Sequence, residues 1–154
     1  MAPPAGQART GLLEVPDLIG TSLRGAPISL GALRGQVVVL DVMANWCQTC
    51  VELLPRWEAL AHRLRGEPFA VIVVSQDEEF ADIEGLVARR GITAPVLRDA
   101  DERWWRAFGC SVMPTAVVIG GDGRLVLRRH GLGQGGFAEV EATIAAELAR
   151  LKRP

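Results

Sequence analysis

The stretch VVVLDVMANWCQTC, residues 37–50, decides the fold of this 154-residue chain. Val37 to Val42 form a nearly continuous apolar run rich in β-branched residues, which predicts a strand buried on both faces. Between Cys50 and Arg65, apolar residues recur at the three- and four-residue spacing of an amphipathic helix. The two cysteines, Cys47 and Cys50, therefore stand where a buried strand ends and a helix begins.

The segments that follow predict one α/β domain. A second apolar run at residues 69–74 predicts a strand parallel to the first, because a helix joins the two. The sequence Gly-Gly-Asp-Gly at residues 120–123 indicates a hairpin. Further helices are expected at 77–90, 100–108 and 138–151, and further strands at 115–119 and 124–129. The expected architecture is a central mixed sheet flanked by helices on both faces.

Composition excludes several functional classes. The chain is 49% apolar and 23% charged, which fits an ordinary globular core. Its 17 basic and 18 acidic side chains give a formal net charge of −1, so nucleic acid is not an expected partner. No apolar stretch approaches the ~20 residues of a spanning helix. With only three cysteines, the chain does not fit a disulfide scaffold.

The N-terminal residues are expected to form a flexible leader over residues 1–14, followed by a single domain over residues 15–154. The leader is rich in Pro, Ala and Gly, and it lacks the basic start and apolar run of a secretory signal. Two origins remain open: a native tail, or the remainder of a trimmed targeting segment.

The Cys-Gln-Thr-Cys motif predicts a reactive dithiol. Unpaired N–H groups and the helix dipole at a helix N-terminus stabilise a thiolate, so Cys47 is the expected nucleophile. Cys50, one turn later, is placed to resolve a mixed disulfide at Cys47. The alternatives are two inert thiols or half of a zinc site, which needs about four N or S ligands. Cys110, His62 and His130 do not form a second ligand pair, so no metal or cofactor is expected.

Several motifs resemble the thioredoxin superfamily. Residues 38–50 resemble its active-site strand and helix start, and Pro55 fits the proline inside its first active-site helix. Met113-Pro114-Thr115 resembles the loop whose proline is cis and faces the cysteine pair. Residues 15–36 and the helix at 77–90 are similar to the TlpA/ResA-like thiol reductases. The resemblance, over residues 15–151, implies a thioredoxin fold with an N-terminal extension and an extra helix insertion.

The resemblance implies a thiol-disulfide oxidoreductase that exchanges disulfides with protein substrates through its CxxC dithiol, as a reductase. Related proteins act outside the cytoplasm, on substrates such as apocytochromes, and receive electrons from a membrane or soluble thiol reductant. A monomer in the periplasm or another extracytoplasmic compartment is therefore expected, membrane-anchored in its full-length form. A cytoplasmic location is the alternative.

The chain departs from that branch at one catalytic position. Leu53 stands where the branch usually has an acid, and the neighbouring Glu52 lies about 100° around the helix. Asp41 occupies the position of thioredoxin's buried acid. In an apolar strand its pKa is expected to be raised, so that it can relay the proton of Cys50. The alternative is a satisfied polar group at a strand end.

The resemblance also implies a substrate-binding surface. The backbone of Met113, turned toward the sulfurs by a cis Pro114, would pair with the substrate as an added strand, next to Thr115. Trp46 is expected either to dock substrate or to pack in the core. Cys110 is expected to pack in the core, with a regulatory thiol near the site as the alternative.

Two other functions remain as alternatives. A copper-binding chaperone would combine the CxxC with His130, but Sco-like relatives place three residues between their cysteines and this chain has two. A thiol peroxidase would need a Thr two residues before its reactive cysteine, behind a Pro. Here Thr49 is adjacent to Cys50 and no such Pro precedes it.

Overall fold

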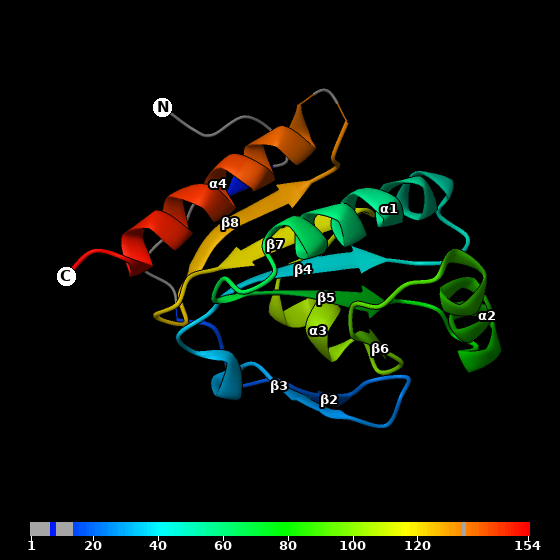
Figure 1. The fold of residues 1–154 in the computed structure, drawn as a ribbon. Helices are drawn as coiled ribbons and strands as arrows, with labels where there is room; N and C mark the ends of the chain where they lie inside the picture. Colours follow the sequence, from blue (N-terminus) through cyan, green and yellow to red (C-terminus); the bar gives the residue numbers. More distant parts are fainter. Residues whose placement is uncertain (1–6, 9–13, 134) are drawn as a thin grey trace.

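A six-stranded mixed sheet forms the centre of the protein in the computed structural model, which describes residues 7–8, 14–133 and 135–154 (Figure 1). The strand order is β1-β8-β7-β4-β5-β6. Strand β4 pairs in parallel with β5 and antiparallel with β7, so the sheet is mixed. The strand bounds are β1 Gln7–Ala8, β4 Val37–Met43, β5 Phe69–Ser75, β6 Val96–Arg98, β7 Thr115–Ile119 and β8 Leu125–His130.

Helices cover both faces of the sheet. One face packs on α1, α2 and α4, whereas the other packs on α3 and a two-stranded hairpin of β2 and β3 (Figure 1). Side chains of β4 alternate between these layers: Val38 and Leu40 join the α3 side, and Val37 and Val39 the α1 side. The remaining bounds are β2 Ile19–Thr21, β3 Pro27–Ser29, a 3-10 helix at Gly31–Leu33, α1 Gln48–Arg63, α2 Phe80–Arg90, α3 Arg103–Ala107 and α4 Gly136–Leu151.

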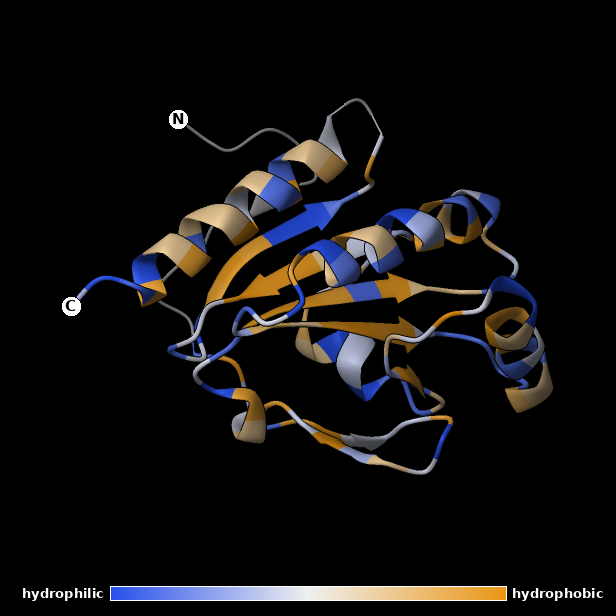
Figure 2. Cartoon of the chain, in the orientation of Figure 1, coloured by the Kyte–Doolittle hydropathy of each residue, from blue (hydrophilic) through white to orange (hydrophobic). Residues whose placement is uncertain are grey.

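The central strands are almost entirely apolar, with Asp41 as a hydrophilic residue in the middle of β4, while the outer helices carry hydrophilic stripes (Figure 2). Every residue of β4 is buried, as expected for a strand covered on both sides. The α/β thioredoxin-like fold and its mixed sheet are therefore confirmed. The N-terminal hairpin is the expected extension, and α2 is the extra helix between β5 and β6.

Two helices begin three residues later than the sequence predicts. The helix expected from residue 77 begins at Phe80, and the one expected from residue 100 begins at Arg103. In both cases an aspartate near the expected start is buried and accepts a hydrogen bond from another segment: Asp77 from the Asn45 backbone N–H, and Asp99 from the Gln76 side-chain amide. These tertiary contacts hold the chain outside the helix for longer than the helical pattern suggests.

The expected leader lies mostly outside the described residues. Residues 1–6 and 9–13 are among those not described, so the leader stays a prediction there. Gln7–Ala8, however, pairs with Arg128 and Arg129 of β8, and Glu14 forms an ion pair with Arg34. Among the helices of the described ranges, none has the length and apolar character needed to span a membrane.

Candidate active site

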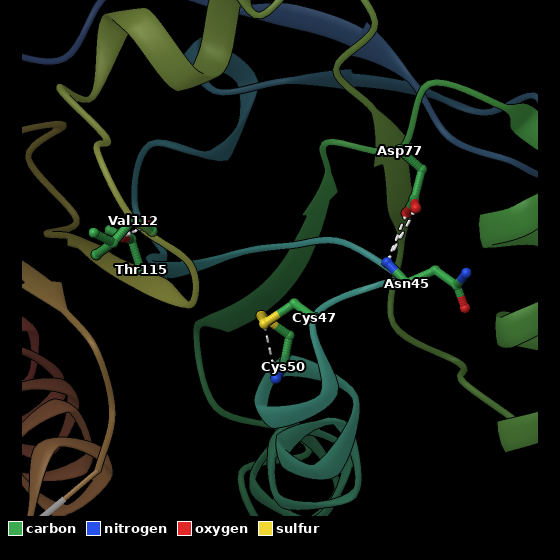
Figure 3. The surroundings of a disulfide bond; sticks show 6 residues. All are labelled: Asn45, Cys47, Cys50, Asp77, Val112 and Thr115. Carbon is green, nitrogen blue, oxygen red and sulfur yellow. Dashed lines mark hydrogen bonds between the residues drawn. A yellow bond between two sulfur atoms is a disulfide. The ribbon is translucent and has the colours of Figure 1, made fainter.

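The two cysteines of the motif form a disulfide at the N-terminus of α1 (Figure 3). Cys47 is the N-cap residue, and its sulfur accepts a hydrogen bond from the Cys50 backbone N–H at 3.3 Å. Their Cα atoms lie 5.2 Å apart. Cys50 is buried and Cys47 is half-buried, so the Cys47 sulfur is the one that a partner can reach. In the reduced state, the same N–H and the helix dipole would stabilise a Cys47 thiolate.

A groove of about 810 Å³ opens beside this disulfide. Cys47 and Trp46 line it, together with Trp105 and Met113. Trp46 is 70% exposed, so the alternative that it packs in the core is wrong. Two aromatic side chains thus border a surface hollow that contains the accessible sulfur.

The loop before β7 reaches the same groove. The Met113–Pro114 peptide bond is cis, and Met113 lines the groove with Val112. Pro114 and Thr115 are buried. The Thr115 hydroxyl donates a hydrogen bond of 2.7 Å to the Val112 carbonyl (Figure 3). Met113 and Cys47 therefore line the same groove, whereas the Thr115 side chain is buried.

Asp41 is fully buried in the middle of β4. Neither of its carboxyl oxygens hydrogen-bonds to any described residue, nor does the indole N–H of Trp57. Burial raises the pKa of Asp41 to about 8, and the nearby Trp57 indole opposes this rise. The alternative of a satisfied polar group therefore does not fit. Because Trp57 follows Cys50 by seven residues, about two turns of α1, both lie on the helix face toward the sheet.

Asp77 is a site residue that the sequence analysis missed. Its carboxylate accepts the Asn45 backbone N–H, with 3.0 Å to each oxygen, and the Ser75 hydroxyl at 2.7 Å (Figure 3). It is buried and lines the groove. Asn45 directly precedes Trp46, so Asp77 fixes the turn that leads into the motif. The only signal in the sequence is an acid two residues beyond a buried strand.

We expect Asp77→Ala to lower the free energy of unfolding by about 1–3 kcal/mol, because the Asn45 N–H and the Ser75 hydroxyl lose their partner. Urea denaturation monitored by tryptophan fluorescence measures this loss. Glu84→Ala, an exposed position on α2, is the matched control and is expected to stay within about 0.5 kcal/mol of wild type. Equal stability of both variants would contradict the anchoring role of Asp77.

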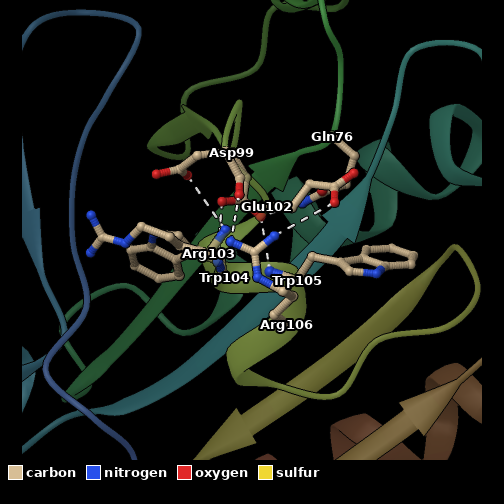
Figure 4. A network of polar contacts seen from close by, with 8 residues as sticks. Gln76, Asp99, Glu102, Arg103, Trp104, Trp105 and Arg106 are labelled. Carbon is tan, nitrogen blue, oxygen red and sulfur yellow. Dashed lines mark hydrogen bonds and ion pairs between the residues drawn. The ribbon is translucent and has the colours of Figure 1, made fainter.

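Asp99 positions the aromatic residue on the groove wall. Its carboxylate accepts the backbone N–H groups of Trp104 at 3.1 Å and Trp105 at 2.9 Å, and the Gln76 side-chain amide at 2.8 Å (Figure 4). Trp104 is buried, whereas Trp105 is partly exposed and lines the groove. The Asp99 carboxylate thus fixes the first turn of α3.

The remaining candidate residues lie elsewhere or are not reactive. Cys110 is a buried free thiol that packs in the core, and burial raises its pKa to about 11. Glu52 is exposed and accepts a hydrogen bond from Gln48, away from the buried Leu53. His62 is exposed near the end of α1. Within the described ranges, no group of three or more His, Cys, Asp or Glu side chains is arranged to hold a metal ion.

Comparison with known proteins gives consistent matches. The model of the AhpC/TSA family matches residues 13–128. The thiol-disulfide oxidoreductase ResA of Bacillus thuringiensis is 27% identical over 113 residues, covering 73% of this chain and 65% of its own length. SUPPRESSOR OF QUENCHING 1 of Arabidopsis thaliana is 29% identical over 148 residues, covering 92% of this chain and 14% of its own length. This chain thus spans less than two thirds of these curated relatives.

A solved structure extends the match to the fold. A Chlorobium tepidum protein described as the thiol:disulfide interchange protein DsbE superimposes with a TM-score of 0.85 at 25% identity. The match covers 92% of this chain and 99% of that protein.

Proposed function

Because this chain belongs to the AhpC/TSA family of the thioredoxin superfamily, we propose that it is a thiol-disulfide oxidoreductase that exchanges disulfides with protein substrates. The observation that carries this proposal is the Cys47–Cys50 disulfide at the N-terminus of α1, with the Cys47 sulfur open to a groove. The matches to ResA and DsbE support the TlpA/ResA-like type.

The reaction uses both sulfurs in turn. The Cys47 thiolate attacks one sulfur of a substrate disulfide, so that a Cys47–substrate bond forms and the substrate bond breaks, releasing a substrate thiolate. Cys50 then loses its proton and attacks the Cys47 sulfur. This closes the Cys47–Cys50 disulfide and releases the second substrate thiol. Two electrons pass to the substrate, and an external dithiol must return them.

The proposed roles of the other residues follow from their positions. Asp41, with its raised pKa, is ionised only in part near neutral pH and can take the proton from Cys50, directly or through water. Met113, before Pro114, offers its backbone to an extended substrate segment. Trp46 supplies an exposed apolar contact at the groove.

The direction of electron flow and the cellular compartment follow from the type of oxidoreductase. We propose a reductase that works outside the cytoplasm, with disulfides of apocytochromes as substrates and a membrane or soluble thiol as its electron donor. The likeness to ResA and DsbE supports this choice of setting.

A redox titration with glutathione tests the proposed direction. Gln48 and Thr49 place no positive charge or histidine between the cysteines, so we expect a potential nearer the thioredoxin value of about −270 mV than the DsbA value of about −120 mV. Insulin reduction in the presence of dithiothreitol tests the activity itself. A potential more oxidising than about −150 mV would contradict a reductase, and no acceleration of insulin reduction would contradict the oxidoreductase.

A further inference from the structure

A buried hydroxyl links the loop at the groove to a histidine on the neighbouring strand. The Thr115 Oγ1 atom lies 2.7 Å from the Val112 carbonyl oxygen and 3.1 Å from Nδ1 of His130. Thr115 is fully buried, and His130 is its partner in the β7–β8 pairing. The proposed function uses neither contact.

The two contacts together determine where the protons lie. A carbonyl oxygen can only accept, so the single hydroxyl proton of Thr115 is donated to Val112. The second contact must then be donated by an N–H at Nδ1 of His130. Burial and the Arg128 guanidinium lower the pKa of His130, so the ring is neutral near pH 7. A neutral ring with its proton on Nδ1 carries none on Nε2.

The Val112 carbonyl in turn orients the next backbone N–H. In a planar trans peptide, the carbonyl of Val112 and the N–H of Met113 point in opposite directions. With the carbonyl held toward Thr115, the Met113 N–H is directed away from the interior of the loop. It forms no hydrogen bond with other residues in the described part of the chain, and Met113 lines the groove beside Cys47.

We infer that His130 is a positioning residue: through Thr115 it holds the Val112 carbonyl inward and keeps the Met113 N–H available to the backbone of a substrate. This inference rests on the proposed function, since it assigns His130 to substrate binding at the same groove. The backbone bond from the Gly131 N–H to the Pro114 carbonyl, at 2.8 Å, anchors the loop independently of the His130 side chain. Because this bond does not involve the imidazole, we expect Pro114 to keep its place in His130→Ala while the Val112 carbonyl loses its restraint.

The proton position is tested on the wild-type protein by NMR. Long-range proton–nitrogen correlation spectra at a pH where the ring is neutral identify the tautomer of each histidine. We expect the Nδ1–H form for His130. The Nε2–H form would overturn the inference, whatever the enzymatic activity of the protein proves to be.

Steady-state reduction of insulin tests the positioning role. We expect His130→Ala to raise KM about three- to tenfold, the range expected for losing one hydrogen bond, with kcat and the reduction potential unchanged. His130→Asn, whose amide N–H can replace Nδ1–H, is expected to restore much of the affinity. His62→Ala, on the exposed face of α1, is the control and keeps the wild-type KM.

Two kinetic outcomes would overturn the inference. One is a wild-type KM in His130→Ala, and the other is an equally high KM in His130→Asn and His130→Ala. A wild-type protein that does not reduce insulin would contradict the proposed function, whereas the NMR result would still decide the hydrogen-bond arrangement.

Discussion

Cys47→Ser is expected to abolish disulfide exchange, lowering the rate of insulin reduction by on the order of 10³-fold or more. Serine keeps the size of the side chain, but its hydroxyl does not ionise near neutral pH and is a poor nucleophile toward sulfur. The N-cap position, which stabilises a Cys47 thiolate, cannot compensate for this difference.

Cys50→Ser is expected to fail differently, because it removes only the second step. The Cys47 thiolate can still attack a substrate disulfide, but nothing within the chain resolves the mixed disulfide. Incubation with a disulfide-bonded protein should therefore give a covalent adduct that dithiothreitol releases, visible on non-reducing gels. Cys47→Ser should give no adduct.

Cys110→Ser is the matched control for both variants. Its thiol is buried and its pKa is raised to about 11, so its replacement should leave the rate of insulin reduction unchanged. A Cys47→Ser protein with wild-type activity, or an adduct that requires Cys110, would contradict the assignment of Cys47 as the nucleophile.

The sequence predicts the fold well because its central strands carry a local signal. The apolar run at residues 37–42 has one place in an α/β domain, the centre of the sheet, and β4 lies there. Helix starts are less predictable where a side chain serves another segment. Asp77 and Asp99 lie at the expected helix starts, yet each accepts a hydrogen bond from another segment, Asp77 from Asn45 and Asp99 from Gln76.

The candidate site likewise has parts that the local sequence predicts and parts that depend on strand pairing. The Cys47 and Cys50 pair is a local feature of one turn, so its geometry follows from spacing alone. The placement of Met113 beside it depends on β7 pairing with β4, and only the family resemblance indicated this. The contact between Thr115 and His130 depends on the register of β7 and β8, which residue spacing does not specify.

Asp41 combines a cost in stability with its proposed role. Its pKa of about 8 in the folded protein lies far above the value near 4 of an exposed aspartate. Between these two values, the unfolded chain is ionised while the folded protein keeps its proton. The unfolded state therefore binds fewer protons, and the free energy of unfolding falls as the pH rises through this window. Below about pH 4 and well above pH 8, Asp41 adds no further pH dependence.

Asp41→Asn is consequently expected to raise stability and lower activity at the same time. Each pH unit between about 4 and 7 costs the wild-type protein about 1.4 kcal/mol, so the free energy of unfolding of Asp41→Asn at pH 7 should exceed that of wild type by about 4 kcal/mol. The difference between the two proteins should vanish near pH 4. Urea denaturation of the oxidised proteins from pH 4 to 9 measures it. Glu84→Ala, an exposed position, should show no such pH-dependent gain.

The activity of Asp41→Asn distinguishes a proton carrier from a merely buried carboxyl. An amide cannot accept the Cys50 proton, so the rate of disulfide reduction should fall about tenfold to a hundredfold. In the wild-type protein we expect this rate to increase as Asp41 ionises near pH 8, and the increase should be absent in Asp41→Asn. A protein that had only lost packing would be less stable and less active together. Opposite changes in stability and rate therefore identify the carboxyl itself, whereas unchanged rates from pH 6 to 9 would exclude Asp41 from proton transfer.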